Sequence, residues 1–197
     1  MEDPNLDQID SVLRLIDREV WIVTSAAAGN QGGLTATWVA PASIDRQQPV
    51  LLASIAPNHF TAELIEESHA FVAHLLRSDQ ASLALDFAKD SGRQRDKMTG
   101  LEFAPAVTGA PVLRDCLAWL DCRVFARFDA GDRLFYWADI VAAGQVSSGS
   151  PLKEQAFLGG LASEARQILL RSREQDLEIQ RPLHAAWRSA LDKPRPP

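Results

Sequence analysis

The chain contains 197 residues, of which 46% are apolar and 23% carry a charge, and these proportions are typical of a folded globular domain rather than of a disordered chain. Lysine and arginine together number 20, and aspartate and glutamate number 26, so the net charge is −6. This balance argues against nucleic-acid binding, which needs a basic surface to neutralise phosphates. No apolar run approaches the ~20 residues that span a bilayer, and the acidic N-terminus does not resemble a signal peptide. We expect a cytoplasmic protein that binds no nucleic acid and no membrane.

The first third of the chain predicts one helix followed by β-strands. Between residues 6 and 16, apolar side chains recur at steps of three and four, and Asp3 with Pro4 supplies the signals of a helix start. The helical spacing of apolar residues then ends. β-Branched and aromatic residues, which are typical of strands, lie on both sides of a glycine-rich turn at 29–33. The expected hairpin and the third strand cover residues 20–25, 34–40 and 50–55.

The middle of the chain alternates short helices with strands. Its spacing predicts a helix over 61–68, a strand over 71–76 and a second helix over 78–89. A charged loop over 90–100 follows. The clearest strand, 118–128, alternates an apolar face with a mixed one, and its hairpin partner is expected over 134–142. The succession of hairpins predicts a mainly β protein of α+β class, with an antiparallel barrel or sandwich at its core.

The last quarter of the chain has helical spacing. A linker at 147–151 precedes one expected helix over 157–169 and a second that begins near Pro182. An extension of this size cannot bury its own core, so it must pack on its own barrel or on a second subunit. We therefore divide the chain into a domain at 1–150 and a helical extension at 151–197, whose last five residues are expected to be frayed.

The two cysteines indicate burial rather than a disulfide. Cys116 and Cys122 fall in one segment that is interpreted as a strand, where six extended residues would separate them by about 20 Å. A disulfide requires a much shorter Cα separation. Both are expected to be small core residues.

Familiar catalytic and metal-binding motifs are absent from the sequence. The four histidines show no metal-ligand spacing, and the chain contains neither a P-loop nor a Gly-x-Ser-x-Gly motif. The glycines at 29–33 lack the dinucleotide-binding spacing and precede a strand rather than a helix. We expect no metal site.

Three polar segments could bind a ligand, and each also has a simpler explanation. Small residues at 32–38 would let a flat ligand approach the main chain, or they form only a tight hairpin. Segment 54–63 ends a strand and begins a helix, where Asn58, His59 and Thr61 could bind an anion, or Asn58 or Thr61 merely caps the helix. The third segment is the charged loop that contains Arg93, Arg95 and Lys97, and it could equally be a solvated loop.

In combination, these segments resemble the flavin reductase family of FMN-binding split barrels from about Val20 to Ala143. The matching pieces, in order, are Trp21–Ser25, Gly33–Thr37, Pro49–Ser54, Thr61–Ile65, Phe87, Asp96–Lys97, Gly109–Leu113 and Leu120–Cys122. The resemblance implies a six-stranded antiparallel split β-barrel with peripheral helices, which forms a homodimer with FMN at the interface. It implies hydride transfer from NADH or NADPH to flavin, and some members supply reduced flavin to a partner monooxygenase.

The resemblance also implies which residues bind FMN. Leu34, Thr35, Ala36, Thr37 and Trp38 would contact the isoalloxazine ring and ribityl chain, and Ser54, Ile55 and Ala56 would line the other side. Asn58, His59 and Thr61 would bind the phosphate, with Lys97 as a point charge. Phe157 corresponds to an aromatic residue that some relatives place near the flavin. We assign no catalytic side chain, because hydride transfer is the cofactor's chemistry.

Two departures from the family pattern leave alternatives open. Many members have lysine and serines where this chain has Pro57, Asn58 and His59, and many have a histidine on the late hairpin that segment 132–139 lacks. The missing histidine leaves it more open whether the chain binds nicotinamide than whether it binds flavin. An FMN-binding electron carrier or storage protein without nicotinamide turnover is the main alternative, and a reductase of another small molecule is the third. Arg133 could contact a nucleotide phosphate, or it could be an ordinary exposed hairpin residue.

Overall fold

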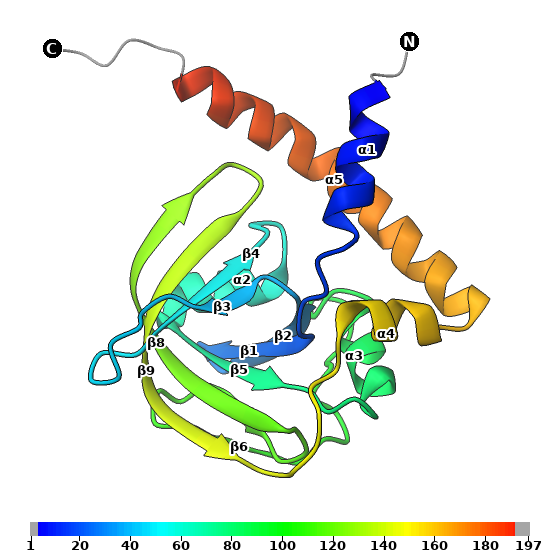
Figure 1. Cartoon of the computed structure of the whole chain (residues 1–197). Helices are drawn as coiled ribbons and strands as arrows, with labels where there is room; N and C mark the ends of the chain where they lie inside the picture. Colours follow the sequence, from blue (N-terminus) through cyan, green and yellow to red (C-terminus); the bar gives the residue numbers. More distant parts are fainter. Residues whose placement is uncertain (1–3, 192–197) are drawn as a thin grey trace, which may run out of the picture.

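The computed structural model describes residues 4–191, in which helices surround a strongly curved β-sheet (Figure 1). Its strands are β1 Trp21–Ala27, β2 Asn30–Ala36, β3 Val39–Pro41, β4 Val50–Ile55, β5 Ala70–Leu75, β6 Phe103–Pro105, β7 Pro111–Leu113, β8 Ala118–Asp129 and β9 Leu134–Gln145. Its helices are α1 Pro4–Leu13, α2 Phe60–Ser68, α3 Ala81–Ala88, α4 Glu154–Gly160 and α5 Ser163–Leu191. The expected helix-start residue Asp3 and the tail at 193–197 lie outside the described residues.

Seven strands pair antiparallel in the order β2-β1-β5-β8-β9-β4-β3, and β6 pairs separately with β7. The expected mainly β, α+β class is confirmed, but the expected six strands are wrong, since the sheet has seven. The segment predicted as one strand over 34–40 breaks at Thr37 and Trp38, and it thereby forms both β2 and β3.

This break joins the two edge strands of the sheet, and it forces the sheet to curl. Ala36 ends β2 and Val39 begins β3, so three Cα steps keep these residues within about 11 Å. A flat sheet of seven strands would hold its edges about 29 Å apart. The sheet therefore closes into a half-barrel, as Figure 1 shows. Register shifts between β8 and β9, at Asp121/Cys122 and Val124/Ala126, add to the bend.

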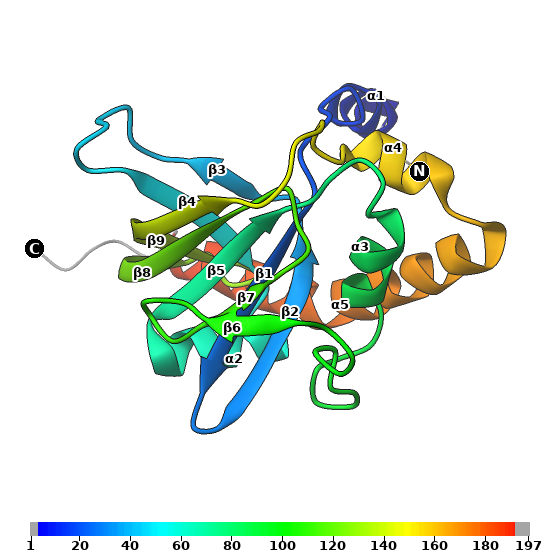
Figure 2. The same cartoon turned by 90° about the horizontal axis from the view of Figure 1, so that it is seen from below.

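Side chains alternate between the two faces of the curved sheet and build two cores. Val23 belongs to the inner core and its neighbour Ile22 to the outer one. The inner core also takes Ala62 and Ile65 from α2, which packs against β1 and β2. The outer core lies under α3 and α4 and contains Val20, Ile22, Leu76, Ala84, Phe87, Met98, Leu113, Leu152 and Phe157. Figure 2 shows α2 and α3 placed around the β1–β2 hairpin.

The first hairpin differs from the prediction in the position of its turn. The chain turns at Ala28 and Gly29, both with positive φ, and residues 30–33 already pair with β1. The glycines of this segment permit close packing instead of a turn, because a Cβ at Gly33 would lie 2.7 Å from Phe87 Cε1.

Both cysteines are free and buried, as expected. Cys122 lies on β8, but Cys116 precedes that strand, so the expectation that one strand holds both is wrong. Burial raises the pKa of the Cys116 thiol to about 11, and burial also raises the pKa of Cys122. Both thiols are therefore protonated and unreactive at neutral pH.

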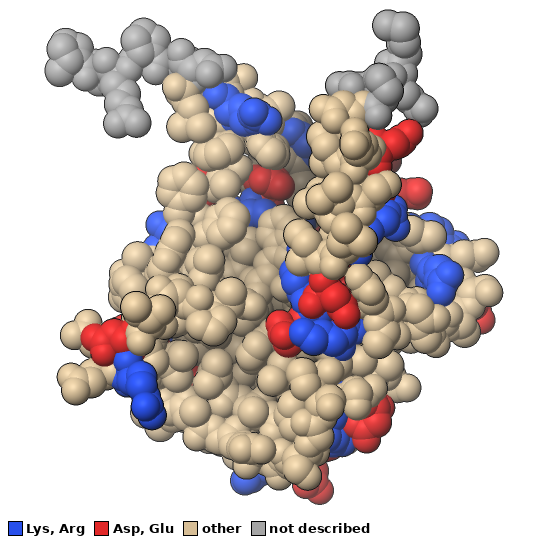
Figure 3. All heavy atoms as spheres, in the orientation of Figure 1, with Lys and Arg blue, Asp and Glu red and all other residues tan. Residues whose placement is uncertain are grey.

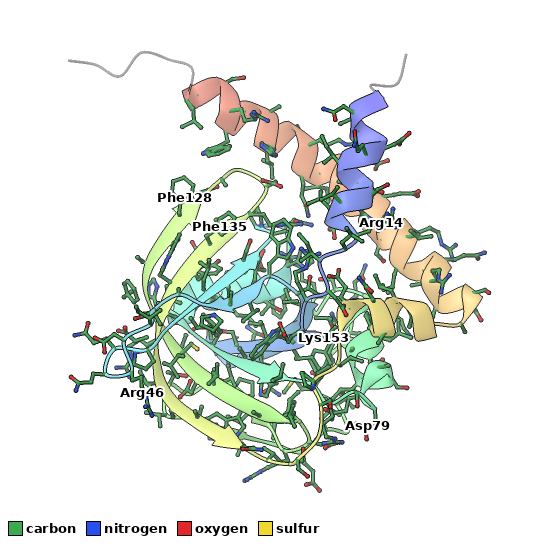
Figure 4. The ribbon with its side chains drawn as sticks, viewed as in Figure 1. Arg14, Arg46, Asp79, Phe128, Phe135 and Lys153 are labelled. Carbon is green, nitrogen blue, oxygen red and sulfur yellow. The ribbon has the colours of Figure 1, made fainter. Side chains whose placement is uncertain are left out.

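The C-terminal segment first pairs with the barrel. Leu152 receives a hydrogen bond from Val20 N (2.8 Å) and donates one to Leu76 O (2.8 Å). Lys153 adds an ion pair to Glu19, with Nζ 2.5 Å from Oε1, and Figure 4 shows Lys153 where the chain enters α4. The segment predicted as a linker therefore leads directly into the outer core.

The first helix expected here, over 157–169, is divided between α4 and α5, and α5 continues through the second start expected near Pro182. Pro182 lies inside it, although proline usually begins a helix. Contacts beyond this proline hold the helix to the tip of the β8–β9 hairpin. The rings of Trp187 and Phe128 meet edge to face at 6.2 Å, and His184 Nδ1 lies 3.6 Å from Asp132 Oδ1. Phe128 is labelled in Figure 4 near this end of α5. The division of the chain at residue 150 stays a prediction.

The surface combines mixed charges with exposed apolar side chains. On the face seen in Figure 3, charges of both signs gather in small groups beside a broad uncharged area. Apolar side chains in and just after α1 are 45–77% exposed, namely Leu6, Ile9, Val12, Leu13, Leu15 and Ile16. No helix within residues 4–191 is long and apolar enough to cross a membrane.

A buried histidine links stability to pH. His74 Nε2 accepts a hydrogen bond from Leu113 N (3.0 Å), so Nδ1 carries the proton and donates to Ile22 O (3.0 Å). Burial lowers the pKa of His74 to about 4, although the hydrogen bond to Ile22 opposes this. The folded protein therefore holds a neutral imidazole.

We expect the free energy of unfolding to fall as the pH drops from 6.5 to 4. Over this range the unfolded chain protonates His74 and the folded chain does not, so acidification favours unfolding, whereas above pH 6.5 the contribution is complete. The contribution of His74 to this loss of unfolding free energy is about 3 kcal/mol. Denaturant unfolding of the wild type and His74→Gln should give a flatter pH profile for the variant. Parallel profiles would contradict this assignment.

We also expect Gly131→Ala to detach α5 from the hairpin. Gly131 has φ +83°, and a Cβ there would lie 2.5 Å from Leu183 O. Gly29 is a matched control, because its φ is +80° but a Cβ there would meet nothing within 4 Å. Both substitutions, Gly131→Ala and Gly29→Ala, should lower the free energy of unfolding by about 1–3 kcal/mol through backbone strain. Only Gly131→Ala should accelerate amide exchange in α5. Equal exchange in the two variants would show that this contact does not hold the helix.

Candidate functional site

A cavity of about 170 Å³ opens where the two edge strands meet. Its lining residues are Leu34, Thr35, Ala36, Thr37, Trp38, Ser54, Ile55, Ala56, His59, Arg133 and Asp176. They come from the β2–β3 link, the end of β4, the start of α2, the β8–β9 hairpin and α5. The structure therefore brings together nine of the twelve residues that the sequence singled out.

Residues 34–38 form the wall of the cavity on the β2 side. Thr35 turns its hydroxyl away to α3, where Oγ1 donates to Ala84 O (2.6 Å). Trp38 O accepts from Ser54 N (2.9 Å), which joins the two sides of the cavity. Because β2 is an edge strand, part of its main chain has no neighbouring strand. A flat ligand could therefore hydrogen-bond to this wall.

Ser54 carries a hydroxyl that lacks a partner. The residue is 9% exposed, and its Oγ makes no hydrogen bond to any residue in the described part of the chain. A buried polar atom without a partner is costly, and a water or a ligand could supply the missing partner here. Ser54 therefore holds a buried hydroxyl without a partner in the wall of the cavity.

Arg133 brings a positive charge to the cavity. Its guanidinium carbon lies 5.2 Å from the centre of the Trp38 ring. Burial lowers the pKa of Arg133, and the carboxylates of Asp132 and Asp176 oppose this; an arginine nevertheless stays protonated. The hairpin residue that the sequence left open is thus half-buried and lines the cavity.

The loop before α2 is bound to α5. Asn58 Nδ2 donates to Asp176 Oδ1 (2.8 Å), and His59 Nε2 lies 3.4 Å from Asp176 Oδ2. Gln180, which is 5% exposed, donates from Nε2 to Asn58 Oδ1 (3.3 Å). Burial raises the pKa of Asp176, but the hydrogen bonds from His59 and Asn58 outweigh it and leave the pKa below its usual value. Neither Asn58 nor Thr61 caps α2, because the N-cap residue is His59, without a side-chain cap bond.

Three of the predicted ligand residues do not line the cavity. Asn58 lies beside it and faces α5, and Thr61 is buried in the first turn of α2. Lys97 is 5% exposed, and its Nζ donates to Phe87 O (2.7 Å), so α3 holds its amine. Burial lowers the pKa of Lys97 to about 8, with a smaller contribution from the nearby Arg95.

Phe157 does not line the cavity either. It is 4% exposed and packs in the outer core, away from the lining residues of this cavity. In this structure the α4 segment anchors the extension to the barrel, and the expectation that Phe157 approaches the flavin stays a prediction.

Asp176 is the lining residue that the sequence reasoning missed. It begins a row of α5 side chains that reach the barrel, followed by Gln180, His184 and Trp187. Steps of three and four place these residues on one helix face. The first three of these side chains are polar, however, and a hydrophobic pattern could not reveal them.

A larger cavity of about 490 Å³ lies elsewhere, beside α3 and β7. One of its charged lining residues, Arg77, is paired with two others, Asp79 and Asp115, at 3.1 and 2.6 Å. None of the predicted ligand residues lines it, whereas nine of them line the smaller cavity. We therefore place the candidate site at the smaller cavity. Within residues 4–191, no three histidine, cysteine or acidic side chains are grouped to hold a metal ion.

Known proteins are similar to this chain in sequence. The reductase subunit HsaB of a flavin-dependent monooxygenase from Rhodococcus jostii is 27% identical over 151 residues, which cover 77% of this chain and 68% of that protein. Diflavin flavoprotein A 1 of Synechocystis is 24% identical over 150 residues, which cover 76% of this chain and 25% of that protein. This chain spans about a quarter of the length of the diflavin flavoproteins that it matches.

Structural comparison gives the same relationship. Nitrilotriacetate monooxygenase component B from Mycobacterium thermoresistibile superposes with a TM-score of 0.66 at 25% identity, over 77% of this chain and 84% of that one. The model of the flavin reductase like domain matches residues 13–155, which include every strand of the sheet and exclude α5. The chain therefore belongs to the flavin reductase like domain family.

Proposed function

We propose that this protein is a flavin reductase that binds FMN in the cavity at the β2–β3 link and transfers hydride from NADH or NADPH to it. The observation that carries the proposal is that residues 34–38 and residues 54–56 line one cavity in a chain of this family. Flavin, when bound, accepts the hydride and supplies the redox chemistry. The protein positions the reactants and excludes water, so no catalytic side chain is assigned.

The cavity residues fit the parts of a flavin. The main chain of residues 34–38 would hydrogen-bond the polar edge of the isoalloxazine ring, and N–H groups there would stabilise negative charge that develops on the ring. Ser54, Ile55 and Ala56 would close the opposite side, with the serine hydroxyl as a donor or acceptor. Because Ala36 and Ala56 have short side chains, the ring could lie close to the backbone.

The loop before α2 would bind the flavin phosphate. Asn58 and His59 offer donors there, and Thr61 lies in the first turn of α2, whose N–H groups and dipole favour an anion. The Lys97 amine is held by α3, so we assign the positive charge of the site to Arg133. Arg93 also lies nearby, since Nη1 donates to Asn58 O (3.0 Å), but its guanidinium is paired with Glu63.

We further propose that the protein acts as a cytoplasmic homodimer. Exposed apolar side chains on and after α1 support this, because monomeric proteins rarely leave such a group uncovered. A flavin-dependent monooxygenase is proposed as the partner that uses the reduced flavin, by analogy with the relative from Rhodococcus.

Oxidation of reduced nicotinamide distinguishes the proposed flavin reductase from an FMN-binding electron carrier. Purified protein mixed with FMN should oxidise NADH or NADPH at a rate that saturates with nucleotide, because the cavity must also admit the nicotinamide. The measurement is the loss of reduced nicotinamide absorbance under air. Protein that binds FMN and oxidises neither nucleotide would instead support the carrier.

We expect Ser54→Ala to weaken FMN binding roughly three- to tenfold, which is the effect of losing one hydrogen bond. The same change should leave the stability of the flavin-free protein equal or higher, because it removes a buried hydroxyl that has no partner. Ser25→Ala is the matched control: Ser25 Oγ donates to Ala70 O (2.8 Å), so this variant should lose stability and keep its FMN affinity. Fluorescence titration and thermal unfolding measure both effects, and unchanged FMN affinity in Ser54→Ala would count against the site.

A further inference from the structure

The α5 helix places a negative charge at the end of the cavity where the proposed function requires a phosphate. Asp176 uses both of its carboxylate oxygens there, one toward Asn58 Nδ2 (2.8 Å) and one toward His59 Nε2 (3.4 Å). These are the two side chains proposed to bind the flavin phosphate. A carboxylate and a phosphate offer the same kind of acceptor oxygen, so both would compete for the same donors.

The position of Asp176 is fixed by the rest of its helix. Gln180, one turn further along, is buried and holds the other side of Asn58. Trp187 and His184 attach the same face of α5 to the β8–β9 hairpin. The carboxylate is therefore held over the cavity by several contacts in addition to its own hydrogen bonds.

From this geometry we propose that Asp176 is a specificity-determining residue, whose carboxylate competes with the flavin phosphate for Asn58 and His59 and so lowers the preference of the site for FMN over riboflavin. The inference rests on the proposed function, because it requires that the cavity bind flavin. It concerns a residue outside the segment 13–155 that the family model matches.

The negative charge of Asp176 should oppose the binding of one flavin more than that of the other. Riboflavin has the same ring and ribityl chain as FMN but no phosphate, so it can occupy the cavity while Asp176 keeps its two partners. FMN must either displace the carboxylate or bind with two anionic groups in contact, and close like charges oppose binding.

The test is a titration of FMN and of riboflavin into the full chain and into two variants. Asp176→Asn removes the charge and keeps the side-chain size, and Glu178→Gln removes an exposed charge from the same helix as a control. We expect Asp176→Asn to raise FMN affinity about tenfold and to change riboflavin affinity less than twofold, with neither affinity altered in Glu178→Gln. FMN, but not riboflavin, should also accelerate amide exchange in α5 of the wild type.

The other outcomes overturn the inference in distinguishable ways. Equal changes for FMN and riboflavin, or no change in Asp176→Asn, would show that the carboxylate does not compete with the phosphate while flavin binding itself stands. Equal gains in Asp176→Asn and Glu178→Gln would reveal a general charge effect. If neither flavin bound to any of the proteins, the proposed function would fail, and the inference with it.

Discussion

The two residues between β2 and β3 impose the constraint on which the rest of the structure depends. Thr37 and Trp38 join the opposite edges of a seven-stranded sheet, and so short a link cannot span the width of a flat sheet. The sheet must curl, and its curling buries the inner core. The same link brings the main chain of one edge against the end of β4. Barrel closure and the candidate site therefore have one cause.

The site combines a rigid wall with a cover that the barrel does not supply. The sheet fixes the main chain of residues 34–38 and the serine at position 54, whereas α5 lies across the phosphate end and reaches it with polar side chains. Much of α5 is exposed, and its attachment depends on a few contacts at the hairpin and the α2 loop. A stable wall with a separate cover suits a site that must admit and release its ligands.

The sequence predicted the elements of the fold better than their connections. Strict alternation revealed β8, and helical spacing located α2 and α3 to within a few residues. The strand break at Thr37 was missed because the residues on both sides favour extended backbone. The first turn was misplaced because Gly32 and Gly33 serve close packing against Phe60 and Phe87, a tertiary demand that local pattern does not reveal.

For the candidate site, the resemblance supplied the segments, and packing decided which side chains face the cavity. The prediction grouped Leu34–Trp38 with Ser54–Ala56, and the structure places them in one cavity. Lys97 faces a carbonyl of α3 instead, and Asp176 reaches the site from a helix whose polar contact face carries no hydrophobic signal. A crystal structure of the protein grown with FMN tests the central claim most directly. The account predicts the ring against the main chain of residues 34–38. Flavin in the cavity beside Arg77, or at neither position, would contradict it.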